Sequence, residues 1–445
     1  MVGADRAGPH PPAAASMTPV TDAADLLDDL AARGLLQDST DRDALAARLA
    51  EGPITLYCGF DPTADSLHVG NLLGLLALRR FQDAGHRPLA LVGGATGMVG
   101  DPSGRSDERN LLDAGTLAAN VAAITAQIGR VLGPEGGWEL VDNATWTAGV
   151  GLLEFLRDVG KHVTVNHMVA KESVKARMQG EHGISYTEFS YMLLQANDYW
   201  WLHANQGCEL QVGGSDQWGN ITAGIDLVRR RSAAVVHGLT WPLLLRSDGT
   251  KFGKSAAGES IWLAPERTSP YRFFQYWMQV DDADVERLLL QLTLVPVAEV
   301  HELAAQHAEA PGKRLAQRRL AAEVTALVHG NAAAADAELA SGVLFGAPLE
   351  AVPEAVLAAL AGEVPTVEVP RAVLVAGIDV VDLLVTAGLA ASKGEARRAV
   401  GQGGAYVNNQ RHGGDAQVGP GDLLFDRYLL VRRGRRDYAL VRVGA

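Results

Sequence analysis

The chain has 445 residues, of which 47% are hydrophobic and 20% charged, a composition typical of a globular protein with two or three domains. Its only cysteines, Cys58 and Cys208, exclude a disulfide framework, and no apolar run approaches the roughly 18 residues of a membrane-spanning helix. The net charge of -13 argues against a chain coated in nucleic acid. We therefore expect a cytoplasmic protein that is not bound to a membrane.

The N-terminal half alternates strand-like and helix-like segments. Residues 1–21, rich in Ala and Pro, are predicted to be a disordered tail. Strands are predicted at 54–60 (ITLYCGF), 88–94 (PLALVGG), 208–214 (CELQVGG) and 241–245 (WPLLL), with helices at 72–85 and from Trp218 onward. This alternation predicts an α/β fold over residues 22–245 with a mainly parallel, doubly wound sheet, which binds ligands at the carboxyl ends of its strands.

Residues 59–71 (GFDPTADSLHVGN) join the first strand to its helix, and His68 and Asn71 lie at the helix start. A helix N-terminus offers unpaired N–H groups and partial positive charge, and Gly70 leaves room for a ligand, so the segment suits a phosphate. The alternative is a helix capped by Asp and Ser with a histidine on the surface.

The glycine-rich run GGATGMVGD (93–101) follows a strand, as a dinucleotide-binding fingerprint does. Its glycines at 94, 97 and 100 are evenly spaced by three, whereas the fingerprint requires a two-residue first step. A structural turn that ends at Asp101 is the simpler interpretation.

A helix is predicted at 188–200 (EFSYMLLQANDYW), where Tyr191, Gln195 and Asp198 share one face at i, i+4 and i+7. A solvent-exposed face would have the same pattern. A phenol, an amide and a carboxylate in line are equally able to hold an ammonium and a hydroxyl.

Two further segments carry polar groups suited to a nucleotide. GGSDQWGN (213–220) places Asp216 and Gln217 at the carboxyl edge of the sheet, where they suit ribose hydroxyls; a capped helix is the alternative. DGTKFGKS (248–255) ends like a P-loop but has three residues between its glycines instead of four. It is interpreted as a mobile loop, within residues 246–268, whose Lys251 and Lys254 meet an anion.

The C-terminal half divides into three parts. Residues 269–346 are helical in pattern and rich in Ala, and residues 347–377 contain several prolines and are interpreted as a linker. Residues 378–445 are predicted to be a small RNA-binding module, because the stretch from Lys393 onward has ten Lys and Arg against five Asp and Glu and contains RRGRR (432–436).

Taken together, five segments resemble the bacterial tyrosyl-tRNA synthetases, class I enzymes, and the resemblance extends from about Asp22 to the C-terminus. They are LYCGFDPTADSLHVGN, LVGGATGMVGDPSG, FSYMLLQANDY, VGGSDQWGNI and KFGKS, in the order of the family. HVGN stands where the class has HIGH, and KFGKS where it has KMSKS. Asn71 replaces the second histidine; it can donate a hydrogen bond but cannot carry charge.

The resemblance implies roles for particular residues of a Rossmann-like catalytic domain. Tyr57 and Asp198 would bind the phenol hydroxyl of tyrosine, and Asp101, Tyr191 and Gln195 its ammonium. The residues implied to catalyse are His68, Asn71, Lys251 and Lys254, and those implied to bind ATP are Asp61, Thr63, His68, Gly70, Asp216, Gln217, Lys254 and Ser255. No metal site of the protein is expected, since Mg²⁺ would be held mainly by the phosphates of ATP.

The resemblance also implies partners. The enzyme would activate tyrosine with ATP and transfer it to the 3′ end of its tRNA, with the helical region facing the anticodon. The C-terminal module resembles one found in small-subunit ribosomal proteins, and the family is homodimeric. Two rivals remain: a tryptophanyl-tRNA synthetase, against which Tyr57 and Asp198 argue, and an RNA-binding protein that has lost catalysis, against which His68, Lys251 and Lys254 argue.

Overall fold

The computed structural model describes residues 23–101, 112–133, 137–179, 183–250, 252–254, 258–350, 352–413 and 416–444. The predicted tail therefore lies outside the described residues. The chain divides into two compact units. The first consists of the described residues within Met1–Asp61, Ala77–Leu111 and Glu135–Pro242, and the second of those within Pro62–Leu76, Leu112–Pro134 and Leu243–Ala445.

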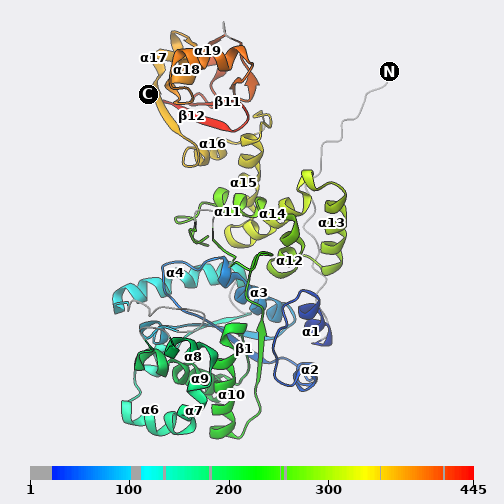
Figure 1. Cartoon of the computed structure of the whole chain (residues 1–445), viewed down its shortest axis with the longest axis vertical. Coiled ribbons are helices and arrows are strands. Elements are labelled where there is room, and N and C mark those ends of the chain that lie inside the picture. The colour runs from blue at the N-terminus through cyan, green and yellow to red at the C-terminus, as the bar shows by residue number, and fades with distance from the viewer. Residues whose placement is uncertain are drawn as a thin grey trace. The chain divides into compact units, whose positions relative to one another are not determined.

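A five-stranded parallel sheet forms the centre of the first unit (Figure 1). Its strands are β1 (Thr55–Phe60), β2 (Arg87–Val92), β3 (Glu139–Asp142), β4 (Cys208–Gly214) and β5 (His237–Trp241), in the order β3-β2-β1-β4-β5. The direction in which successive strands are added reverses between β1 and β4. In a doubly wound sheet this switch point is where ligands bind, outside the carboxyl ends of the strands. The predicted fold class is thus confirmed.

Helices precede, connect and follow the strands of this sheet. They are α1 (Ala23–Ala32), α2 (Arg42–Ala50), α3 (Val69–Asp83), α5 (Ala144–Thr147), α6 (Leu152–Asp158), α7 (Val165–Val169), α8 (Glu172–Gln179), α9 (Tyr186–Gln206) and α10 (Trp218–Ser232), with 3₁₀ turns η1 (Thr96–Met98), η2 (Gly160–His162) and η3 (Ser215–Gln217). The N-terminal part of α3 belongs to the second unit. The long helices α9 and α10 lie side by side (Figure 1), since Met192 and Ala196 share a buried cluster with Ala223 and Leu227.

The fifth strand differs from the prediction. WPLLL (241–245) was expected to be a strand, but β5 ends at Trp241. Pro242 has no N–H group to donate to a neighbouring strand, so the ladder ends there. The residues that follow form a tight hairpin of their own, in which Phe252 N donates to Leu244 O and Arg246 N to Thr250 O.

The second unit contains a helical region. Besides α4 (Ala114–Leu132), it includes α11 (Pro270–Met278), α12 (Asp282–Leu292), α13 (Val297–Glu309), η4 (Pro311–Lys313), α14 (Leu315–His329) and α15 (Asn331–Leu344). Helix α11 begins where Ser269 accepts a hydrogen bond from Arg272 N and Pro270 occupies the first turn, a strong start signal. Its Phe273, Phe274 and Trp277 are fully buried.

The same unit ends in a mixed sheet of order β6-β12-β11-β8-β9, in which β6 (Thr366–Pro370) is parallel to β12 (Asp437–Gly444). The remaining elements are α16 (Glu354–Leu360), α17 (Arg371–Val375), β7 (Ile378–Asp379), α18 (Val380–Thr386), α19 (Lys393–Gly401), β8 (Ala405–Val407), β9 (Gln410–Arg411), β10 (Gln417–Val418), η5 (Pro420–Asp422) and β11 (Tyr428–Arg433). Alternate residues of β11 enter different cores: Leu429 packs with α18, and Leu430 packs with α16.

The segment 347–377 was expected to be a linker, but it contains elements that pack into the C-terminal module. Val356, Leu357 and Leu360 of α16 are fully buried against the sheet, and β6 adds a strand to its edge. Prolines at 353, 365 and 370 flank these elements instead of interrupting them, which is where proline is tolerated. The C-terminal module thus begins before residue 378. Among the described helices, none is long and apolar enough to cross a membrane.

Candidate active site

A buried carboxylate lies at the centre of the site in the first unit. Asp198 on α9 is 2% exposed, and its two oxygens accept hydrogen bonds from Asn143 Nδ2 at 2.9 Å and Trp146 Nε1 at 2.8 Å. Tyr191, on the same helix face, is 5% exposed. The face that was predicted from its spacing therefore points into the protein, and the alternative of a solvent-exposed face is wrong.

Tyr57 of β1 lies close enough to Asp198 for the carboxylate charge to act on it. The tyrosine is 1% exposed, and its phenol oxygen has no hydrogen-bond partner among the described residues. Burial raises the pKa of Tyr57, and the charge of Asp198 raises it further. A buried polar atom without a partner costs about 1–3 kcal/mol, so such atoms are retained where a ligand supplies the partner.

Burial also raises the pKa of Asp198, to about 7, although its two donors oppose the shift. The nearby carboxylates of Asp61 and Asp142 act in the same direction as burial. Because a carboxylate has about four acceptor sites and two are used, Asp198 can accept a further hydrogen bond. Tyr57 and Asp198 together are therefore able to bind a hydroxyl group.

The glycine-rich turn packs so closely against carboxylates of this pocket that side chains at two of its glycines would not fit. A Cβ atom on Gly93 would lie 2.9 Å from Asp61 Oδ1, and one on Gly94 would lie 2.2 Å from Asp142 Oδ1. Asn143 binds the turn to the pocket, because its Oδ1 accepts from Ala95 N at 2.7 Å while its Nδ2 donates to Asp198. These glycines have a structural role, which agrees with the interpretation as a turn.

A second group of polar side chains is linked by hydrogen bonds. Gln217 Nε2 donates to Asp101 Oδ2 at 2.8 Å, and Gln217 Oε1 accepts from Gln195 Nε2 at 3.4 Å and from Asn220 Nδ2 at 3.1 Å. Asn220 Oδ1 in turn accepts from Lys171 Nζ at 2.6 Å. The phenol of Tyr191 donates to Asp61 Oδ1 at 3.3 Å.

In the second unit, His68 and Asn71 cap the start of α3 reciprocally. His68 Nδ1 accepts from Gly70 N, and Asn71 Oδ1 accepts from His68 N, both at 3.0 Å. Since Nδ1 is an acceptor, the proton of a neutral His68 is on Nε2, and Asn71 retains its Nδ2 donor. A Cβ on Gly70 would lie 2.8 Å from the His68 ring. In the alternative interpretation Asp and Ser capped this helix; among the described residues His68 and Asn71 form the cap instead, and His68 is exposed as that interpretation had it.

The segment that carries Lys254 pairs with this helix start. Ile261 N donates to Gly253 O, and Ile261 O accepts from Val69 N, both at 3.0 Å. His68 forms an isolated bridge with Trp262, whose ring lies 6.3 Å from the imidazole, edge to face. The backbone thus brings the HVGN and KFGKS motifs together within one unit.

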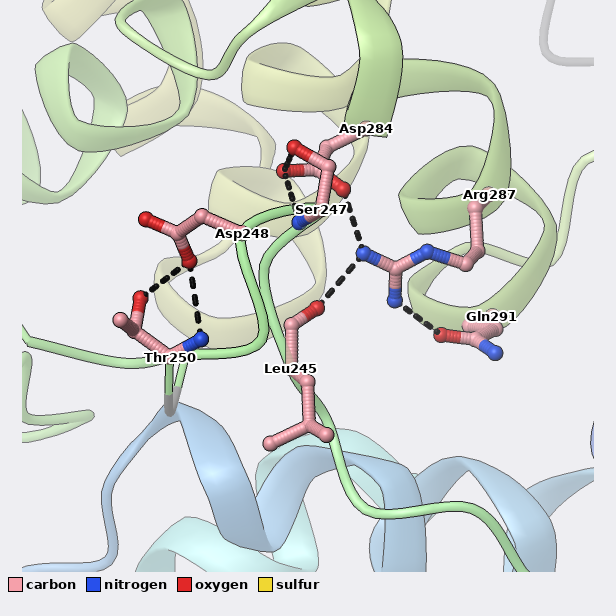
Figure 2. A network of polar contacts seen from close by, with 7 residues as sticks. All are labelled: Leu245, Ser247, Asp248, Thr250, Asp284, Arg287 and Gln291. Carbon is pink, nitrogen blue, oxygen red and sulfur yellow. Dashed lines mark hydrogen bonds and ion pairs between the residues drawn. The ribbon is translucent and has the colours of Figure 1, made fainter.

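The hairpin that precedes Lys254 is fixed to the helical region. Figure 2 shows Arg287 of α12 donating to Leu245 O and Asp284 Oδ1, both at 2.6 Å, and Ser247 N donating to Asp284 Oδ2 at 3.2 Å. Asp248 closes the tip by accepting from Thr250 N at 2.8 Å. The stem of the loop therefore has a defined anchor on α12.

Phe252 is a second anchor for this loop. Its ring is 8% exposed and lies 5.5 Å from Tyr276 and 5.8 Å from Trp277, and Gly253 N donates to the Tyr276 hydroxyl at 3.0 Å. The Arg246 guanidinium lies over the Phe252 ring, 5.3 Å from its centroid, and donates to Lys254 O at 3.1 Å. An apolar residue thus separates the two lysines of the motif and holds the backbone.

The predicted site residues fall into both units. Tyr57, Asp61, Asp101, Tyr191, Gln195, Asp198, Asp216 and Gln217 belong to the first, and Thr63, His68, Gly70, Asn71 and Lys254 belong to the second. Asp216 and Thr63 are exposed. Lys251 and Ser255 lie outside the described residues.

Sequence reasoning missed Asn143, Trp146, Lys171 and Asn220. Asn143 directly follows β3, a four-residue strand that was not predicted, so its place at a carboxyl strand end was not visible. Asn220 lies within the segment that was singled out for Asp216 and Gln217, three residues beyond Gln217 and within reach of it in the first helical turn.

Comparison with known proteins agrees with these features. Residues 49–346 match the family described as tRNA synthetases class I (W and Y), and residues 357–441 match the tyrosine–tRNA ligase SYY-like C-terminal domain. The chain therefore belongs to the class I tRNA synthetases.

Individual relatives identify the amino acid for which enzymes similar to this chain are named. The tyrosine–tRNA ligase of Opitutus terrae is 56% identical over 423 residues, 94% of this chain and 99% of the relative, and that of Anaeromyxobacter dehalogenans is 54% identical with the same coverage. A solved structure, a C-terminally truncated mitochondrial tyrosyl-tRNA synthetase of Aspergillus nidulans, has a TM-score of 0.65 and 32% identity, and the match covers 72% of this chain and 94% of that chain. Within its class, this chain is a tyrosine–tRNA ligase, an enzyme that uses ATP.

Proposed function

We propose that the phenol hydroxyl of L-tyrosine binds between Tyr57 and Asp198 and that this pair selects tyrosine. The observation that carries the proposal is the burial of both groups beside each other, with the Tyr57 oxygen unpartnered. A substrate hydroxyl donates to the carboxylate and accepts from the Tyr57 phenol. Phenylalanine leaves both groups desolvated without a partner, which costs more than the contact it retains is worth.

The substrate ammonium is held by Asp101, Tyr191 and Gln195. Support comes from the hydrogen bonds that order Asp101 and Gln195 around Gln217, and from the burial of Tyr191. A carboxylate and two oxygen acceptors match the three N–H donors of an ammonium group. In this arrangement the α-carboxylate of tyrosine is left free to react.

The ATP-binding role of the family is assigned to Asp61, Thr63, Gly70, Asp216 and Gln217. His68 Nε2 and Asn71 Nδ2 donate toward phosphate oxygens, and the N–H groups at the start of α3 add partial positive charge. Lys251, Lys254 and Ser255 hold the β- and γ-phosphates. Asn71 therefore replaces a histidine as a neutral donor.

Catalysis then requires positioning and charge stabilisation. The tyrosine carboxylate is already ionised and attacks the α-phosphorus in line, so that a C–O–P bond forms and pyrophosphate leaves. The loop lysines stabilise negative charge that grows on the leaving group. Mg²⁺ enters with ATP and is held mainly by phosphate oxygens. In the second step a hydroxyl of the terminal ribose of the tRNA attacks the carbonyl carbon of tyrosyl-adenylate, so that an ester forms and AMP leaves.

The C-terminal module supplies a surface for the tRNA. Arg435 and Arg436 line a cavity of about 590 Å³ that also includes Phe345, which is 78% exposed, and Tyr271. Guanidinium groups and an exposed ring are suited to phosphates and to unpaired bases. The helical region faces the anticodon, and the enzyme acts in the cytoplasm as a homodimer, as its family membership suggests.

The test is the exchange of labelled pyrophosphate into ATP, measured in the presence of each of the twenty amino acids in turn. We expect exchange with tyrosine, and with neither tryptophan nor phenylalanine at the same concentration. Exchange with tryptophan would overturn the assignment of the pocket, and no exchange with any amino acid would mean that the chain binds RNA without catalysis.

A further inference from the structure

Lys171 begins a chain of hydrogen bonds that ends at Asp101. The residue directly precedes α8 and is half-buried, and its Nζ donates to Asn220 Oδ1 at 2.6 Å. Asn220 Nδ2 donates to Gln217 Oε1 at 3.1 Å, and Gln217 Nε2 donates to Asp101 Oδ2 at 2.8 Å. A cation is thus connected to a carboxylate through two amide groups.

The two ends fix the direction of every bond between them. An ammonium group has donors only, so Asn220 must present its oxygen to Lys171 and its NH₂ group to Gln217. Gln217 must then accept with its oxygen and donate with its nitrogen, which requires an acceptor at Asp101. If Lys171 is removed, the Asn220 oxygen loses its partner and Asn220 holds the Gln217 oxygen less firmly, whereas the Asp101 carboxylate still fixes the direction of the Gln217 amide.

This direction also determines which atoms reach the substrate. Gln195 Nε2 donates to the same Gln217 oxygen at 3.4 Å, so the other atom of that amide, Oε1, is the acceptor that remains available. Gln195 Oε1 has no donor among the described residues. The pocket therefore presents oxygen acceptors from Gln195 and Asp101, as an ammonium group requires.

The position of Lys171 is electrostatically costly. Its ammonium contacts Asn220, in the first turn of α10, where the helix dipole disfavours a cation. Burial lowers the pKa of Lys171 to about 7, although the charge of Asp101 opposes the shift. Gly219 is needed for the lysine to fit, since a Cβ there would lie 2.8 Å from Lys171 Cε. A cation kept at such a cost is typical of a functional site.

We propose that Lys171 is a positioning residue that holds the Asn220–Gln217–Asp101 chain in place, so that the amino-acid pocket accepts an ammonium group. The inference rests on the proposed binding of the tyrosine ammonium by Asp101 and Gln195. Lys171 does not touch the substrate in this role, and its effect is confined to ligands that have an ammonium group.

The experiment measures equilibrium binding of three ligands to the full-length protein and to the Lys171→Met variant. The ligands are L-tyrosine, tyramine, which lacks the carboxylate, and 3-(4-hydroxyphenyl)propionate, which lacks the ammonium. We expect the Kd values of L-tyrosine and tyramine to rise about 10- to 100-fold, the range for hydrogen bonds to a charged group. The Kd of the propionate should change less than about 3-fold.

Two further variants control for indirect effects. Lys161→Met makes the same change at an exposed lysine of the first unit and should leave all three Kd values unchanged. Asn220→Asp can still accept from Lys171 but cannot donate to Gln217, so it should weaken the same two ligands. Thermal unfolding shows whether Lys171→Met folds; it should be at least as stable as wild type, because it removes a buried cation.

The outcomes are distinguishable. Equal weakening of all three ligands by Lys171→Met would mean that Lys171 supports the fold of the pocket, and weakening of L-tyrosine and the propionate alone would mean that it acts on the carboxylate. No weakening of any ligand would mean that it does not act on the pocket. Each of these outcomes overturns the inference. If wild type binds the propionate as tightly as L-tyrosine, the ammonium site itself, and with it that part of the proposed function, is wrong.

Discussion

The ionisation of Asp198 governs what its pocket can bind. Burial moves the pKa of this carboxyl to about 7, so that near neutral pH both forms are present in the ligand-free enzyme. The ionised form is the acceptor that a phenol hydroxyl needs. Protonation weakens that acceptor, because the proton removes the negative charge and takes one of the two acceptor positions that Asn143 and Trp146 leave free.

We predict that tyrosine binding weakens as the pH falls below about 7. The folded-state pKa lies above its usual value, so the neutral form gains as the pH falls, and the Kd should rise by at most about tenfold per pH unit, the limit for one proton. Equilibrium titrations at pH 5.5 to 8.5 would measure this.

Phenylalanine provides the control for this pH profile. It brings the same ammonium and carboxylate but no hydroxyl, so its inhibition constant should not rise below pH 7. A parallel rise for both amino acids would assign the titration to a group that both amino acids contact, instead of to Asp198.

A second prediction at this scale concerns Lys254 of the KFGKS motif. We predict that Lys254→Ala lowers the rate of adenylate formation by about 10² to 10³, the usual loss for one electrostatic donor in a transition state, and leaves the Kd of tyrosine unchanged. Pre-steady-state kinetics and equilibrium binding would separate the two quantities. Weaker tyrosine binding with an intact chemical step would rule out the proposed role.

At the scale of elements, the hairpin of residues 244–253 joins the cationic loop to α12 (Figure 2). We predict that Arg287→Ala, which removes the donor to Leu245 O, lowers adenylate formation about tenfold, because the loop lysine is held less precisely. Tyrosine affinity should not change, since the pocket lies on other elements. Stopped-flow measurements on the purified variant would test this.

A matched control is Arg319→Ala on α14. This arginine forms ion pairs with Glu299 and Glu323 in the same helical region. Among the described residues, it forms no hydrogen bond or ion pair with the hairpin. It should leave the rate intact, and an equal loss in both variants would show that general destabilisation of the helices is responsible.

Helix faces and strand ends that are determined by residues close together in the sequence could be predicted. The spacing of Tyr191, Gln195 and Asp198 was sufficient to place them on one face of α9, and glycines marked the ends of β1, β2 and β4. What the sequence did not reveal depends on distant partners. β6 pairs with β12, about 70 residues away, and the proline-rich flanks of β6 are typical of a linker until that partner is known.

The site shows the same limit. Asn143 and Trp146 are ordinary residues in the sequence, and they become part of the pocket only because β3 adds to the sheet next to β2. Lys171 lies 49 residues from the asparagine that it binds. Side chains that support a site from another element carry no local signal, whereas those on a single helix do.

At the scale of the whole molecule, the C-terminal module should be separable from amino-acid activation. We predict that truncation after Gly346 leaves pyrophosphate exchange intact and reduces tRNA charging, with a loss that is largest at low salt concentration, where phosphate contacts of the module are strongest. Truncation after Pro370 should be less soluble, because it keeps α16 and β6 but removes the sheet that covers Val356, Leu357 and Leu360. Loss of exchange in a folded Gly346 truncation would contradict this division.

The central claim is that Asp198, beside Tyr57, is the reason this enzyme accepts tyrosine and refuses phenylalanine. The most direct test is kcat/KM for activation of both amino acids by wild type and by Asp198→Ala. We predict that the ratio of tyrosine to phenylalanine falls at least tenfold, since the variant loses the acceptor for the hydroxyl and also the buried charge that penalises phenylalanine. An unchanged ratio, whatever the absolute rates, would show that Asp198 does not read the hydroxyl and would contradict the account.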